Sequence, residues 1–150
     1  MIRDVDHEVL SAVAVNFFIN ANLVGWPIQE ENRKKHHCNI PWAILLDPTS
    51  ACNLHCTGCW AAEYGNKLNL TFDEIDCGFL SFTNGTLIDE KFADEMLRVK
   101  NFVPAISLEG NEAATDGRRG SGVFGKATHA MELLHERKLL YGISSCYTSA

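Results

Sequence analysis

Residues 40–60 read IPWAILLDPTSACNLHCTGCW and join an apolar run to a loop that carries three cysteines. The unbroken run AILL predicts a strand over residues 40–47 that is buried on both faces, as in parallel sheets. Cys52, Cys56 and Cys59 follow this strand within one short loop. The loop is therefore expected at the carboxyl end of a strand, where α/β proteins place their chemistry.

The spacing of the three cysteines allows one tight loop to aim three sulfur atoms at a single point, as in a metal site. A [4Fe-4S] cluster normally takes one cysteine on each of its four irons, so three cysteines leave one iron open to a small molecule. Two other interpretations are three unrelated core thiols, or a structural zinc site completed by His55, His36, His37 or Cys38. The spacing alone leaves these interpretations open.

Composition narrows the possible classes of protein. The 150 residues are few for a complete α/β barrel, which usually needs roughly 200 or more. A net charge of −6 without a basic stripe argues against nucleic acid as a partner. The longest apolar run, residues 9–19, is too short to span a bilayer, and no secretory signal is present. We therefore expect a cytoplasmic protein without a membrane partner, whose six cysteines stay reduced.

The N-terminal part predicts a helix over residues 5–23, because apolar residues recur every four positions. We expect this helix to pack against the α/β core and to end at Gly25, Trp26 and Pro27. A polar connector, QEENRKKHHCN, follows, and its adjacent histidines are expected to be surface residues. The chain is thus divided into residues 1–39, a helix with its connector, and residues 40–150, the core domain.

Beyond the cysteine loop, strands and helices alternate. A capping box at residues 71–74 predicts the start of a helix, but Gly78 follows only seven residues after Thr71. Strands are then predicted in CGFLSFTNGT (residues 77–86), at residues 103–109 and at residues 141–147. Helices are predicted from the cap Asp89 to about Lys100 and over residues 123–138, with NEAATDGRRGSG (residues 111–122) as a loop. Gaps that contain a helix require parallel crossovers, so the predicted fold is α/β, an incomplete parallel barrel of about four strands.

Polar residues at the end of one predicted strand are candidates for a site. Ser107 and Glu109 are two positions apart, so alternation directs both side chains to one face. The alternative is a strand end that frays into water. The glycine-rich loop that follows contains Asp116, Arg118 and Arg119, and such charges are usually solvated.

The C-x3-C-x2-C run after a strand resembles the cluster loop of radical S-adenosylmethionine (SAM) enzymes, and the later motifs are similar to peptide-maturing and cofactor-biosynthesis members. The resemblance covers residues 40–150 and implies an incomplete (β/α) barrel of the radical SAM type. It also implies a [4Fe-4S] cluster on Cys52, Cys56 and Cys59 and bound SAM. Reductive cleavage of SAM would then give a 5'-deoxyadenosyl radical, which would abstract hydrogen from an unknown substrate.

The same resemblance implies roles for other residues and for partners. Ser107 and Glu109 match strand-end residues that contact SAM, and Arg119 matches an arginine that helps to hold the SAM carboxylate. Thr83 and Asn84, at the end of the preceding strand, are assigned to the same cofactor site. The implied partners are a peptide or small-molecule substrate and an electron donor such as a flavodoxin or ferredoxin.

The sequence departs from this family pattern in two places. Gly58 precedes the third cysteine where the family usually has an aromatic residue, although Trp60 follows. A Gly-Gly-Glu-type strand end is absent, and the chain passes from FDEID to CGFLSFT as if one βα unit and the C-terminal part were missing. An alternative function is therefore a non-catalytic fragment that binds a cluster or zinc without productive SAM cleavage, and a third is an interaction domain without metal.

Overall fold

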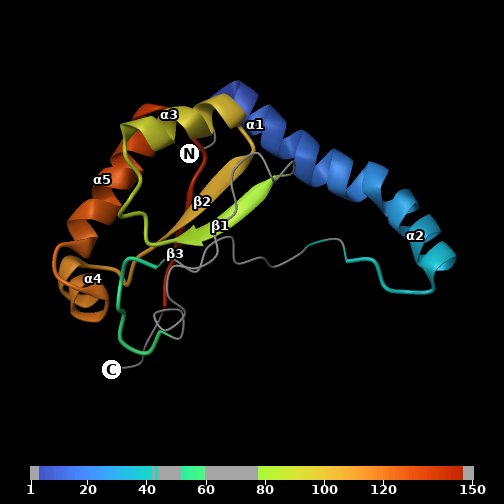
Figure 1. Ribbon diagram of the computed structural model, residues 1–150. Helices are drawn as coiled ribbons and strands as arrows, with labels where there is room; N and C mark the ends of the chain where they lie inside the picture. Colours follow the sequence, from blue (N-terminus) through green and yellow to red (C-terminus); the bar gives the residue numbers. More distant parts are fainter. Residues whose placement is uncertain (1–3, 42, 44–51, 60–77, 147–150) are drawn as a thin grey trace.

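The computed structural model describes residues 4–41, 43, 52–59 and 78–146. These residues contain a sheet of three parallel strands in the order β1 (Phe79–Thr83), β2 (Phe102–Ser107) and β3 (Gly142–Ser144) (Figure 1). The three later predicted strands and their parallel pairing are confirmed, with β3 shorter than expected. The predicted strand over residues 40–47 and the capping box at residues 71–74 lie largely or wholly outside the described residues.

Helices α3 (Glu90–Val99) and α5 (Val123–Glu136) form the crossovers between the strands (Figure 1). Asp89 caps α3 as predicted, since its carboxylate accepts a hydrogen bond from the Phe92 N–H at 2.8 Å. The core lies between these helices and the sheet, and its largest fully buried side chains include Met96, Ile106 and Leu134. On β1, Leu80 and Phe82 are 63% and 65% exposed, so the described strands form an open α/β sheet and do not close a barrel.

The turn after β1 depends on Gly85. This residue has φ +72°, and a Cβ atom there would lie 3.1 Å from the Ile106 side chain, so both the conformation and the space favour glycine. The Thr83 hydroxyl accepts a hydrogen bond from the Gly85 N–H at 3.1 Å. Asn84, which precedes Gly85, does not have a positive φ. The turn is thereby fixed on the core.

The prediction of a loop at residues 111–122 is wrong, because this segment contains the helix α4 (Glu112–Arg119). Asn111 caps this helix by accepting the Ala114 N–H at 2.9 Å, and Thr115 within the helix is fully buried. The Thr115 hydroxyl accepts the Glu109 N–H at 3.1 Å. One buried residue and a good cap thus outweigh a composition rich in charge and glycine.

The N-terminal helix is longer than predicted. It runs through α1 (His7–Ala14), the π-helical stretch η2 (Val15–Val24) and α2 (Gly25–His36). Pro27 does not end it, because it falls in the first turn of α2, where proline is tolerated. Gly25 permits the preceding π-helical turn, since a Cβ atom there would lie 2.8 Å from the Asn20 carbonyl oxygen.

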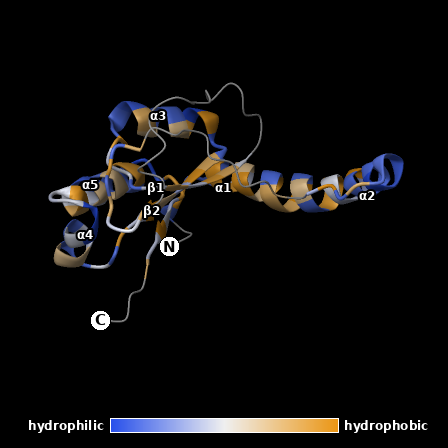
Figure 2. Cartoon of the chain, turned by 60° about the horizontal axis from the view of Figure 1, so that its bottom comes forward, coloured by the Kyte–Doolittle hydropathy of each residue, from blue (hydrophilic) through white to orange (hydrophobic). Residues whose placement is uncertain are grey.

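The expectation that this helix packs against the core is confirmed only for its beginning. The Asp6 N–H donates to the Lys138 carbonyl at 2.8 Å, and Val9 is 2% exposed. From η2 onward the helix extends away from the sheet (Figures 1 and 2), and many of its large apolar side chains are exposed to solvent. They include Phe17, Phe18, Leu23, Val24, Trp26 and Ile28. An apolar pattern shows that a surface favours burial, but not what covers it.

This extension also changes the interpretation of the N-terminal region with respect to membranes. By length and composition alone, the 30-residue helix His7–His36 could cross a bilayer, with 6% of its most apolar window buried. The prediction that the region is too short is therefore wrong. Core helices of soluble proteins, which are mostly buried, and signal sequences near an N-terminus pass the same test of length and composition, so the helix assigns no location to the protein.

Candidate functional site at the carboxyl edge of the sheet

The cysteine loop, residues 52–59, is attached to two parts of the core (Figure 1). The Asn53 side chain makes hydrogen bonds to Asn84 and Thr86, which follow the carboxyl end of β1. The Thr57 N–H donates to the Arg118 carbonyl in α4 at 3.1 Å. The loop therefore lies at the carboxyl edge of the parallel sheet, as predicted from the chain order.

The three thiols are free and accessible. Cys52 is exposed, whereas Cys56 and Cys59 are half-buried, so the interpretation as core thiols does not hold for them. A turn with Gly58 at φ +74° brings the Cys59 N–H to the Cys56 carbonyl at 3.1 Å. Partial burial raises the pKa of Cys56, Arg119 opposes this shift, and the neighbouring Cys59 and Cys52 add to it. The thiols are thus close enough to influence one another.

Among the described residues, which include these three cysteines and all the histidines proposed for zinc, no group of three or more His, Cys, Asp or Glu side chains is gathered closely enough to hold a metal ion. The three accessible thiols are the kind of donor that holds iron–sulfur clusters, and they are one fewer than the usual four. Ligation and local folding are commonly coupled. Gathering the three sulfur atoms around one point would accordingly be part of cluster binding.

Glu109 and two arginines of α4 form a desolvated ion-pair group beside the loop. The Glu109 carboxylate accepts from Arg119 Nε at 2.5 Å, from Arg119 Nη2 at 2.7 Å and from Arg118 Nη1 at 2.7 Å. The side chain of Glu109 is 7% exposed and that of Arg119 is 14% exposed. The hydrogen bonds from Arg119, more than the burial that opposes them, hold the pKa of Glu109 below its usual value.

Within the part of the chain that the structure describes, this geometry leaves one nitrogen of the Arg119 guanidinium without a hydrogen-bond partner. The Nε and Nη2 atoms face Glu109, while Nη1 donates no hydrogen bond to any described residue. Arg119 also interacts electrostatically with Cys56 and Cys59. A guanidinium that one carboxylate holds in place can bind a second carboxylate through its remaining edge.

The other candidate residues lie along the same edge. Ser107 is the last residue of β2 and is half-buried, with Ser144 opposite it on β3. Thr83 is the last residue of β1, and Asn84 follows it in the turn. The structure therefore brings the predicted residues to the ends of two adjacent strands, whereas their contacts with a cofactor stay a prediction.

One polar residue of this region has a structural role that the sequence interpretation misses. The Asp116 carboxylate accepts the Gly122 N–H at 2.6 Å and the Phe124 N–H at 2.8 Å, which supplies partners for the first turn of α5. The bond from Phe124, followed by that from Gly122, lowers the pKa of Asp116 from its usual value. The sequence signal for this capping role was an acidic residue shortly before an apolar helix.

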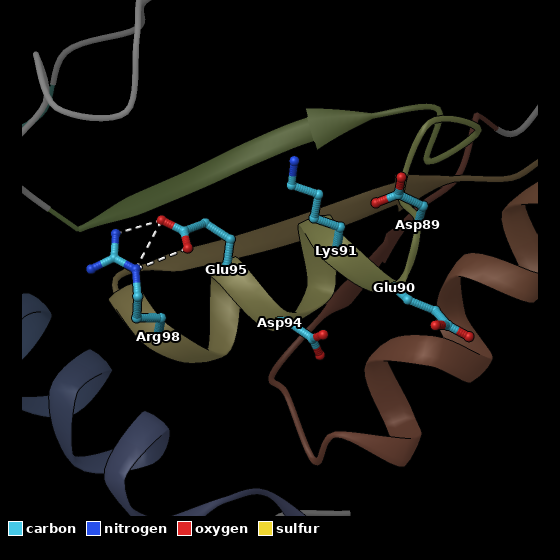
Figure 3. A pocket seen from close by; sticks show the side chains of 6 residues that line it. All are labelled: Asp89, Glu90, Lys91, Asp94, Glu95 and Arg98. Carbon is cyan, nitrogen blue, oxygen red and sulfur yellow. Dashed lines mark hydrogen bonds and ion pairs between the residues drawn. The ribbon is translucent and has the colours of Figure 1, made fainter.

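A separate, open depression lies over α3 (Figure 3). Its lining is entirely charged, and Glu95 and Arg98 are joined by hydrogen bonds of 2.9 and 3.0 Å from Nε. In Figure 3 the remaining side chains spread along the helix and do not converge on one point. The depression therefore has the character of a solvated helix face.

The fold was compared with known proteins. A scan against protein-family models gives no match, and neither does a search of the curated proteins. The chain is similar to a solved structure described as native anSMEcpe with bound AdoMet and Kp18Cys peptide, with a TM-score of 0.54 and 20% identity over 64% of this chain. The complex described with Cp18Cys peptide gives 0.52 and 22% over the same share. The chain spans 40% of the length of each of these proteins. The likeness shows that the chain has the α/β fold of part of these AdoMet-bound proteins.

Proposed function

We propose that the protein is a radical SAM protein that binds a [4Fe-4S] cluster through Cys52, Cys56 and Cys59. The observation that carries the proposal is the attachment of the three-cysteine loop to the carboxyl edge of a parallel sheet, beside the Glu109–Arg119 pair. The similarity of fold to proteins that bind AdoMet, which is SAM, supports it. The proposed core domain comprises residues 40–150, with residues 1–39 as an N-terminal extension.

When bound, the cluster would supply the electron that cleaves SAM reductively to a 5'-deoxyadenosyl radical, which abstracts hydrogen from the substrate. The residues of the chain would place SAM for this chemistry. Arg119 would hold the SAM carboxylate through its Nη1 edge, while Glu109 keeps the guanidinium in position. Ser107, Thr83 and Asn84 would line the same edge of the sheet.

The proposed partners follow from the same reasoning. The similar structures contain peptides, so we propose a peptide, or a small molecule, as the substrate. An electron donor such as a flavodoxin or ferredoxin would reduce the cluster. A cytoplasmic setting suits an oxidation-sensitive cluster, because thiols stay reduced there.

A second candidate function is a non-catalytic fragment that binds a cluster or zinc without productive SAM cleavage. Two observations favour it. The sequence has no Gly-Gly-Glu-type strand end, and the described thiols are not gathered into a formed site. Both features would leave SAM poorly placed for cleavage, and small misplacements at a reacting centre can cost on the order of a hundredfold in rate.

Metal analysis of the anaerobically purified chain tests the proposed function. We expect brown protein with iron and acid-labile sulfide in about equal amounts, as in a [4Fe-4S] cluster. Colourless protein with stoichiometric zinc would instead support a structural metal site. Protein without either metal, even after incubation with iron and sulfide under reducing conditions, would contradict both metal-binding functions.

A further inference from the structure

A closed ring of hydrogen bonds joins the cysteine loop to the turn after β1. Asn53 Nδ2 donates to Thr86 Oγ1 at 2.9 Å, Thr86 Oγ1 donates to Asn84 Oδ1 at 2.8 Å, and Asn84 Nδ2 donates to Asn53 Oδ1 at 3.0 Å. Within the ring, each side chain donates one hydrogen bond and accepts one. The bonds that involve Asn53 join residues 31 and 33 positions apart in the chain.

The ring is built on a rigid support. Asn84 Oδ1 also accepts the Thr86 N–H at 3.0 Å, and Gly85 between them is packed against Ile106 in the core. Two of the three ring bonds are exposed, and the bond between Thr86 Oγ1 and Asn84 Oδ1 is partly buried. Exposed single hydrogen bonds contribute little, so closure of the ring and its fixed support matter more than any one distance.

The ring and α4 hold the cysteine loop at two points. Asn53 is adjacent to Cys52, while Thr57, whose N–H bonds to the Arg118 carbonyl at 3.1 Å, is adjacent to Cys56. Cys52 is the most exposed of the three cysteines and lies at the end of the loop away from the α4 contact. Without the ring, its end of the loop would lose its described attachment to the sheet.

We propose that Asn53 is a positioning residue that fixes the Cys52 end of the loop to the sheet through Asn84 and Thr86. Its role in holding a cluster ligand rests on the proposed function, whereas the attachment itself does not. Asn53 touches neither the reacting atoms nor the metal in this account. It acts through the position of the adjacent cysteine.

The attachment is tested first on the chain without a cluster, by hydrogen exchange of residues 52–59. Asn53→Ala and Thr86→Val each open the ring, and the second keeps the shape of the side chain. We expect about two- to tenfold faster exchange in both variants, the range that one net hydrogen bond gives. Thr86→Ser keeps the hydroxyl and should restore the original rate. Asn32→Ala, which removes a surface asparagine bond to the Ile28 carbonyl, is the matched control, and peptides from α5 should exchange unchanged in every variant.

The second measurement is the rate of iron loss from the reconstituted protein to a chelator. Loss should be about two- to tenfold faster in Asn53→Ala and Thr86→Val, and unchanged in Thr86→Ser and Asn32→Ala. Unchanged exchange in both ring-opening variants overturns the attachment, whatever the iron measurement gives. Faster exchange with unchanged iron loss overturns the positioning role. If the unaltered chain takes up no iron, the proposed function fails, and hydrogen exchange alone decides the attachment.

Discussion

Single replacement of Cys52, Cys56 or Cys59 by alanine should abolish the iron–sulfur absorbance of the reconstituted protein. Each variant retains two of three thiolates, which leaves two irons of the cluster without a protein ligand. The measurement is the visible absorbance together with iron and sulfide content.

The remaining cysteines serve as matched controls. Cys38 and Cys146 are exposed and free, and Cys77 lies outside the described residues. Replacement of any of these three by alanine should leave the absorbance unchanged. A full cluster in Cys56→Ala, or loss of the cluster in the Cys38 or Cys146 variant, would show that the ligand set is wrong.

Replacement of Arg119 by alanine should weaken SAM binding by about ten- to a hundredfold, as expected for the loss of a hydrogen bond to a charged group. The same change leaves the nearly buried carboxylate of Glu109 with Arg118 as its described partner. Glu109→Gln should also weaken binding, because it releases the guanidinium from its fixed orientation. Equilibrium dialysis of SAM against the reconstituted protein measures both effects.

Arg98→Ala provides a control for the charge change, since Arg98 is a 66% exposed arginine that pairs with Glu95 on α3. It should bind SAM as the unaltered chain does. Equal affinities for all four proteins would mean that the Glu109–Arg119 pair is structural and does not contact SAM. Comparing the thermal midpoints of the variants separates a loss of binding from a loss of folding.

Much of the sheet and its crossovers could be predicted from the sequence, because these elements have strong local signals. The Asp89 cap and the apolar face around Met96 define α3, and the apolar run in VPAIS marks β2. Helix α4 was missed because its signal is a single cap at Asn111 and one buried residue, Thr115. Composition alone favoured a loop.

The remaining features depend on contacts that no local pattern contains. Continuation of the N-terminal helix through Pro27 depends on where the π-helical stretch ends, and exposure of Phe17 and Phe18 depends on which surface is present to cover them. The candidate site was predicted as the cysteine loop, a set of strand-end residues and Arg119. However, the pairing of Glu109 with Arg119 and the ring around Asn53 join residues 10 and more than 30 positions apart.

The most direct test of the central claim is electron paramagnetic resonance of the dithionite-reduced, anaerobically reconstituted protein with and without SAM. The account predicts a reduced [4Fe-4S] signal that SAM perturbs slightly, because three cysteines leave one iron open while the Gly-Gly-Glu-type anchor is absent. The perturbation should disappear in Arg119→Ala at the same SAM concentration. Absence of the signal, or a signal that saturating SAM leaves unchanged, would contradict the assignment of this chain as a radical SAM protein.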